Sequence, residues 1–120
     1  MDIVVGVADM KVSNDPDAAL ITYSLGSCIG VAIYDPVATV GGLLHYMLPD
    51  SKIDGRKAQR NPCIFGDTGI PLLFKEAYKI GAQKNRLKVI VAGGAQILDQ
   101  TGLFNIGKRN YTLVRKIFWK

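Results

Sequence analysis

Three apolar stretches follow one another within residues 20–48, and the breaks between them are short. They are LITYSL (20–25), CIGVAIYD (28–35) and VGGLLHYML (40–48). Connections this short join antiparallel strands, because parallel strands need a crossover of about a dozen residues or more. The break DPVA (35–38) suits a type I turn with Pro36 at its second position. The sequence therefore predicts an antiparallel hairpin over residues 28–48.

The rest of the chain predicts two more strands, two helices and two polar loops. We expect strands at 3–8 and 87–92, helices from Asp67 or Thr68 to about Ile80 and over 108–119, and loops at 13–18 and 49–62. The order of strands, then helix, strand and helix indicates an α/β (α+β) fold. We expect a layered α/β sandwich with mainly antiparallel strands, built as one domain.

Composition supports a soluble globular protein. The chain has 120 residues, of which 48% are hydrophobic and 21% charged, which is enough for a core without disulfides. No apolar run approaches the ~20 residues of a membrane span. The first ten residues carry two aspartates and no basic segment, so they do not resemble a signal peptide. We expect a cytoplasmic protein without membrane insertion.

The net charge of +5 is unevenly distributed along the chain. Residues 1–50 hold six aspartates and one lysine, whereas residues 51–120 hold 14 lysines and arginines against four acids. A basic half can favour an acidic partner or nucleic acid. However, these basic residues are scattered and not interleaved with aromatic residues, as a single-strand binder would require. A solvated basic surface is the favoured interpretation, and no nucleic-acid partner is expected.

The chain has only two cysteines, Cys28 and Cys63, and one histidine, His45. A structural zinc site usually needs about four Cys or His ligands. Three widely spaced candidates do not supply them, and two cysteines do not make a disulfide framework. We therefore expect no metal, and no cofactor of another kind. Cys63 is expected to be a thiol in a loop or at a helix start, without a catalytic role.

The hairpin brings Cys28 and His45 to one face of the sheet. If Pro36 and Val37 are the two loop residues, Cys28 lies directly opposite His45. A shift of two in this register keeps the pair diagonal on one face, whereas an odd shift separates them. Two structural alternatives remain open: Cys28 as a small buried apolar residue and His45 as a hydrogen-bonded core residue.

A neighbouring Cys and His can carry out acyl transfer to water through a thioester. An imidazolium lowers the pKa of a nearby thiol, and the imidazole can protonate a leaving amine and then activate water. Backbone N–H groups at the turn Gly26-Ser27 could stabilise an oxyanion, and these small residues leave room for the substrate backbone.

Four segments, in order, resemble the CheD family of chemoreceptor glutamine deamidases. They are LGSCIGVAIYDPVATVGGLLHYMLPDS (25–51), FGDTGIPLLFKEAYKIGA (65–82), VIVAGGAQIL (89–98) and NIGKRN (105–110). The resemblance covers nearly the whole chain. It implies hydrolysis of glutamine side-chain amides on chemoreceptors, with receptor cytoplasmic domains and a CheC-like response-regulator phosphatase as partners.

The resemblance also implies roles for three residues. Cys28 would be the nucleophile, His45 the general base and acid, and Thr22 the residue that orients the imidazole. The alternation of side chains along a strand does not predict this role for Thr22. A two-residue hairpin at Gly26-Ser27 places Thr22 on the face opposite to that of Cys28, unless the connection is not tight or the strand bends.

Family members continue beyond the helix matching 108–119, through a further strand. Residues 1–120 are therefore expected to form a single CheD-like domain without the family's C-terminal strands, which would expose apolar surface including Phe118 and Trp119. Receptor methylester hydrolysis remains open as a related reaction. A non-catalytic module that docks on receptors or on a CheC-like phosphatase remains open as the alternative of another class.

Overall fold

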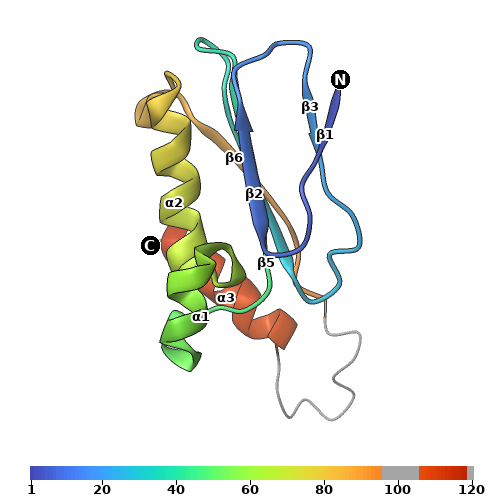
Figure 1. Cartoon of the computed structure of the whole chain (residues 1–120), viewed down its shortest axis with the longest axis vertical. Coiled ribbons are helices and arrows are strands. Elements are labelled where there is room, and N and C mark those ends of the chain that lie inside the picture. The colour runs from blue at the N-terminus through green and yellow to red at the C-terminus, as the bar shows by residue number, and fades with distance from the viewer. Residues whose placement is uncertain (96–105, 119–120) are drawn as a thin grey trace.

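The computed structural model describes residues 1–95 and 106–118 and has three layers (Figure 1). The central layer is an antiparallel sheet in the order β2 (Asp9–Ser13), β5 (Val40–Tyr46), β4 (Ile29–Asp35), β6 (Lys88–Gly93). One face carries the helices α1 (Gly55–Arg60), α2 (Gly66–Lys79) and α3 (Ile106–Phe118). The other face carries a two-stranded parallel sheet of β1 (Asp2–Val4) and β3 (Ala19–Ile21). The expected layered α+β sandwich with mainly antiparallel strands is confirmed.

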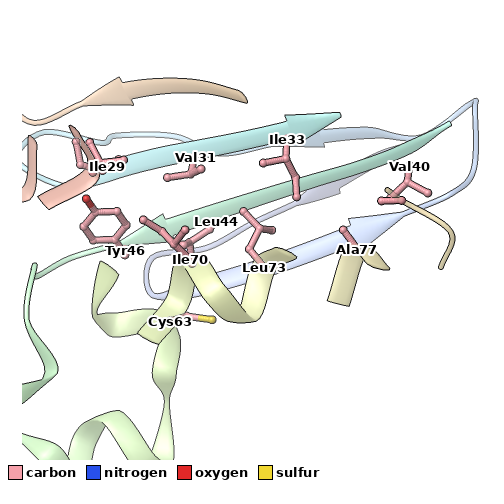
Figure 2. Packing of buried hydrophobic residues seen from close by; sticks show 12 residues of the cluster. Ile29, Val31, Ile33, Val40, Leu44, Tyr46, Cys63, Ile70, Leu73 and Ala77 are labelled. Atoms are coloured by element: carbon pink, nitrogen blue, oxygen red, sulfur yellow. The ribbon is translucent and has the colours of Figure 1, made fainter. Parts of the chain in front are cut away.

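Side chains of β4 and β5 alternate between the helical layer and the small sheet. Successive strand residues point to opposite faces, so alternate positions form the core. Figure 2 shows this packing against α2, and the fully or almost fully buried side chains include Ile29, Val31, Ile33, Val40, Leu44, Tyr46, Ile70, Leu73 and Ala77. The remaining positions of the two strands, among them Gly30 and His45, face the small sheet instead.

The β4–β5 hairpin has a longer loop than expected, which corrects the Cys28–His45 register. Asp35 pairs with Val40 across a four-residue connection, so that Gly30, not Cys28, lies opposite His45. The Asp35 carboxylate accepts hydrogen bonds from the N–H groups of Val37 and Ala38, at 2.9 and 3.1 Å, and organises this loop. The register shift is two residues, so Cys28 and His45 stay diagonal on one face.

Asp35 also ties this hairpin to the chain leading into β6. Its side chain is fully buried and accepts the Nε–H of Arg86 at 3.0 Å and the backbone N–H of Gln83 at 2.9 Å. The Arg86 guanidinium holds the pKa of the Asp35 carboxyl well below its usual range. A buried carboxylate is therefore fully partnered at the end of the sheet that is remote from Cys28.

Several local expectations need correction. Strand β2 was not predicted, and the expected strands at 3–8 and 20–25 shrink to the short β1 and β3. The segment 49–62 is helical, with short 3₁₀ turns at Ser51–Ile53 and Pro62–Ile64 on either side of α1. The side chains of the N-cap residues Asp50 and Asp54 accept hydrogen bonds from backbone N–H groups of these turns. This capping stabilises helical structure in a polar segment that was expected to be a loop.

The two long helices and β6 occur close to where the sequence predicts them. Helix α2 starts at Gly66 without a side-chain cap, because Phe65 occupies the N-cap position. Asp67, expected near the start of this helix, lies in its first turn, where its carboxylate accepts from the N–H and hydroxyl of Ser51. It ends before Gly81, which has a φ of +112°. On α3, the ring of Phe118 lies 5.9 Å from that of Phe74 and is partly buried, not simply exposed. Trp119 lies outside the described residues.

The helices described are all too short or too polar to cross a lipid bilayer.

The core predicts a clear contrast between two apolar truncations. Leu73→Ala removes a fully buried side chain between α2 and the sheet and should lower the free energy of unfolding by about 3 kcal/mol. Ile90→Ala is the matched control, because Ile90 is 71% exposed and its loss should change stability by at most about 0.5 kcal/mol. Urea denaturation measures both, and equal effects would contradict this description of the core.

Candidate active site

The candidate site lies between the central sheet and the β1–β3 sheet. His45 is in β5, on the face away from the helices, and is fully buried. Its carbonyl accepts the N–H of Ala8 at 2.8 Å, in the segment that links β1 to β2. The small sheet therefore covers the imidazole and shields it from solvent.

Thr22 reaches the imidazole from the residue directly after β3. Its Oγ1 lies 2.9 Å from His45 Nδ1 and 2.8 Å from the carbonyl oxygen of Val5. A carbonyl only accepts, so the single hydroxyl proton of Thr22 goes to Val5. The Thr22 oxygen must then accept a proton from His45 Nδ1. This geometry selects the tautomer in which Nδ1 is protonated and Nε2 carries a free lone pair.

The other imidazole nitrogen is available for chemistry. His45 Nε2 is buried and has no hydrogen-bond partner among residues 1–95 and 106–118. Burial lowers the pKa of the His45 imidazole, which favours its neutral form. A buried polar atom without a partner is unusual and calls for an explanation. A neutral Nε2 on the face shared with Cys28 has the properties of a general base.

Cys28 stands at the end of a tight turn just before β4. Its N–H donates to the carbonyl of Leu25 at 2.7 Å, which closes the turn Leu25–Cys28. Gly26 has a φ of +53° whereas Ser27 is outside the left-handed region, the pattern of a type II′ turn. Glycine at the first central position is what this turn requires. The side chain of Cys28 is partly exposed.

The thiol is not activated by charge in this structure. Burial raises the pKa of the Cys28 thiol, and no neighbouring cation offsets that effect. The sequence raised a thiolate–imidazolium pair as a way to lower this pKa. Burial lowers the pKa of the His45 imidazole as well, so in this structure burial disfavours the charged form of both groups.

A bend in the chain brings Thr22 to His45, although the alternation of side chains before the Gly26-Ser27 turn places Thr22 on the other face. The turn at Gly26-Ser27 is tight, but the strand before it ends at Ile21 and belongs to the other sheet. Ser24 has a φ of +57°, which breaks the alternation of side chains. A bent strand, the second of the two alternatives, therefore reconciles the tight turn with the contact between Thr22 and His45.

The turn that carries Cys28 has both free and engaged backbone groups. Among the described residues, the N–H groups of Gly26 and Ser27 have no acceptor, whereas the N–H of Cys28 is used by Leu25. Only the first two can therefore point at a developing oxyanion.

Two residues next to this site were missed by sequence reasoning: Val5, whose carbonyl fixes the Thr22 proton, and Asn110, whose amide donates to Ser27 O at 2.8 Å. No local signal marks Val5. The NIGKRN segment drew attention to Asn110, but only as a family motif.

Other candidate chemistry is absent from the described part of the chain. Across residues 1–95 and 106–118, no three His, Cys, Asp or Glu side chains cluster in the manner of a metal site. Cys63 lies in the 3₁₀ turn Pro62–Ile64 and is buried in the apolar core on the helical side. It is thus on the other side of the sheet from His45.

Comparisons with known proteins identify the family of this chain. Residues 47–120 match the family model described as "CheD chemotactic sensory transduction". The chain is 59% identical over 119 residues to the "Probable chemoreceptor glutamine deamidase CheD 1" of Syntrophus aciditrophicus, covering 99% of this chain and 74% of that protein. It is 54% identical over 118 residues to the "Probable chemoreceptor glutamine deamidase CheD" of Solibacter usitatus, covering 98% of this chain and 70% of that protein. On these matches, the chain belongs to the CheD family.

Proposed function

We propose that this chain is a protein-glutamine deamidase that acts on glutamine side chains in the cytoplasmic domains of chemoreceptors during chemotaxis adaptation. The names of its relatives support the substrate. The hydrogen-bond chain from His45 Nδ1 through Thr22 to Val5 O is the observation that carries the mechanism. It gives the single histidine of the chain the tautomer and orientation of a general base.

The first step forms a thioester. His45 Nε2 accepts the proton of the Cys28 thiol as the sulfur attacks the amide carbon of the glutamine side chain. The tetrahedral intermediate collapses when the imidazolium returns that proton to the amide nitrogen, which leaves as ammonia. The carbon–nitrogen bond breaks, the carbon–sulfur bond remains, and His45 is neutral again.

The second step hydrolyses the thioester. His45 Nε2 accepts a proton from water, whose oxygen attacks the same carbon. The second tetrahedral intermediate expels the sulfur, which regains its proton from the imidazolium. Glutamate is released and Cys28 returns to the thiol form. No oxidant, metal or cofactor is consumed.

Backbone groups stabilise the charge that develops on the carbonyl oxygen. The free N–H groups of Gly26 and Ser27 are the donors we assign to this oxyanion. Removing one such donor typically lowers kcat by about 10²–10³-fold in other acyl-transfer enzymes. Thr22 keeps the imidazole oriented throughout, because the only hydroxyl proton of Thr22 stays hydrogen-bonded to Val5 O.

A CheC-like phosphatase is proposed as a second partner, on the family resemblance. A chain that binds receptors or such a phosphatase without converting glutamine would be the regulatory module of the alternative interpretation. The partnerless Nε2 of His45 favours catalysis, because a docking surface does not require a fully buried base without a hydrogen bond.

Active-site substitutions should separate the three roles. Cys28→Ala should abolish conversion of a receptor cytoplasmic fragment, observed as a gain of about one mass unit per modified glutamine, and His45→Ala should nearly abolish it. Thr22→Val keeps the shape but removes the hydroxyl, and should lower kcat about 10–100-fold. Thr22→Ser is the matched control, since it retains the hydroxyl and should keep most of the activity.

Two results would contradict these roles. If Cys28→Ala converts glutamine at the wild-type rate, Cys28 is not the nucleophile, and the same result for His45→Ala would show that His45 is not the base. Equal activity of Thr22→Val and Thr22→Ser would remove Thr22 from the mechanism. A wild-type chain that binds the receptor fragment but converts no glutamine would favour the regulatory module.

The raised pKa of the Cys28 thiol and the lowered pKa of the His45 imidazole predict the pH midpoints of two measurements, the alkylation of Cys28 and kcat/KM. Alkylation of Cys28 by iodoacetamide should titrate above the roughly 8.5 of a free thiol, because burial raises the pKa of Cys28. The acid limb of kcat/KM should lie below about 6.5, because burial lowers the pKa of His45 and keeps it a base at lower pH. Mass spectrometry of the Cys28 peptide and initial rates measure the two. A Cys28 midpoint well below 8.5 would instead indicate a thiolate–imidazolium pair.

A further inference from the structure

Three successive carbonyl groups around Cys28 are held by segments far along the chain. We call residues Leu25–Cys28 the nucleophile loop. The N–H of Ala95 donates to Gly26 O at 2.9 Å, and the N–H of Gly94 donates to Cys28 O at 2.9 Å. Between them, Asn110 Nδ2 donates to Ser27 O at 2.8 Å. The nucleophile loop is thus fixed through all three carbonyls, by one turn and one side chain.

The side chain of Asn110 also reaches the strand that carries His45. Its Nδ2 donates a second hydrogen bond, at 2.8 Å, to the carbonyl of Met47, two residues beyond His45. A side-chain amide has two N–H protons, and here both are used. One planar group therefore connects the residue before the nucleophile to the end of the strand that bears the base.

The burial of Asn110 indicates that this connection has a purpose beyond packing. Asn110 is fully buried, and within the described part of the chain its Oδ1 has no hydrogen-bond partner. Burying an unpaired carbonyl is unfavourable, so a position needed only for packing is better served by an apolar side chain. Asparagine is well suited here because it gives two donors to two carbonyls without adding a charge.

The helix that carries Asn110 is anchored independently of the amide. The Tyr46 hydroxyl donates to the backbone carbonyl of Asn110 at 2.8 Å. At Gly107, a Cβ would collide with the carbonyls of Gly94 and Ala95, so the start of α3 packs directly on this turn. The amide can thus be removed while other contacts keep the helix docked.

We propose that Asn110 is a positioning residue, whose amide sets the placement of Cys28 relative to His45. This inference rests on the proposed deamidase function. Catalysis requires the thiol proton, the imidazole Nε2 and the substrate carbon to come within reach together, and a misplacement of about 1 Å can lower a rate about 10²-fold. The Nδ2 hydrogen bonds of Asn110 go to the backbone carbonyls of Ser27 and Met47, so it acts through the nucleophile loop.

The test compares Asn110→Ala and Asn110→Ser with Tyr46→Phe in the full chain. Tyr46→Phe removes the other buried hydrogen bond of α3 and leaves the amide intact, so it controls for loss of helix anchoring. Each variant is assayed for glutamine conversion on a receptor cytoplasmic fragment, for thermal unfolding, and for iodoacetamide alkylation of Cys28 and Cys63 in the same sample.

We expect Asn110→Ala to lower kcat at least about 10-fold with KM within about 2-fold of wild type. Its Cys28 midpoint should fall towards that of a free thiol, because a released loop loses the burial that raises the pKa of Cys28. Asn110→Ser can bond only one of the two carbonyls and should be intermediate. Tyr46→Phe should lower the melting temperature while keeping kcat and the Cys28 midpoint. Cys63, buried in the core, should stay protected in all four proteins.

Equal kcat and equal Cys28 midpoints in Asn110→Ala and Tyr46→Phe would overturn the inference. So would cooperative unfolding lost in both Asn110 variants with rapid alkylation of Cys63, which would make Asn110 a residue of global stability. If the wild-type chain converts no glutamine, the proposed function fails. The Cys28 and Cys63 alkylation then decides the positioning inference separately, because it needs no receptor.

Discussion

A hydroxyl group has one proton to donate, and at Thr22 that proton is committed to the carbonyl of Val5. This constraint determines how the rest of the site works. Since the Thr22 oxygen can then only accept, His45 must present its Nδ1–H to it, and its Nε2 must carry the lone pair. The backbone of the β1–β3 layer therefore selects the tautomer of a side chain in the other sheet. The carbonyl of Val5 matters as much to the base as Thr22 does, although the identity of residue 5 contributes nothing to that bond.

The two faces of β4 and β5 have separate tasks, and strand alternation keeps them apart. Val31, Leu44 and Tyr46 face the helices and supply the core, whereas Gly30 and His45 face the small sheet. Gly30 pairs with His45 and has no side chain. A Cβ added at Gly30 would lie 3.2 Å from the side chain of Leu25, which packs over this position. The burial of His45 lowers the pKa of its imidazole and favours the neutral form. The same sheet thus provides a dry core on one side and a dry base on the other.

Strand parity predicted that Cys28 and His45 share a face, because an even register shift does not change the face. It could not predict the loop length, because the Asp35 carboxylate bonds two N–H groups within the connection and lengthens it. Side-chain alternation could not predict the contact between Thr22 and His45 for another reason. This contact needs β3 to leave the central sheet and Ser24 to adopt a left-handed conformation, which non-glycine residues rarely do. Family resemblance pointed to Thr22, and tertiary structure gives the physical route.

The proposed nucleophile, Cys28, and the proposed base, His45, are held from different layers of the fold. His45 is fixed by Thr22 and Val5 from the small sheet, whereas the nucleophile loop is fixed by the Gly94-Ala95 turn and by Asn110 from α3. The central sheet, the short chain segment 23–24 between Thr22 and the nucleophile loop, and the amide of Asn110, through Met47 O, connect the two. The packing of α3 on the end of the sheet is therefore one of the contacts that hold the nucleophile loop beside the end of β5. Because burial disfavours the charged form of both Cys28 and His45, an ion pair between them is not favoured, and the contacts from the surrounding layers hold the two segments in place.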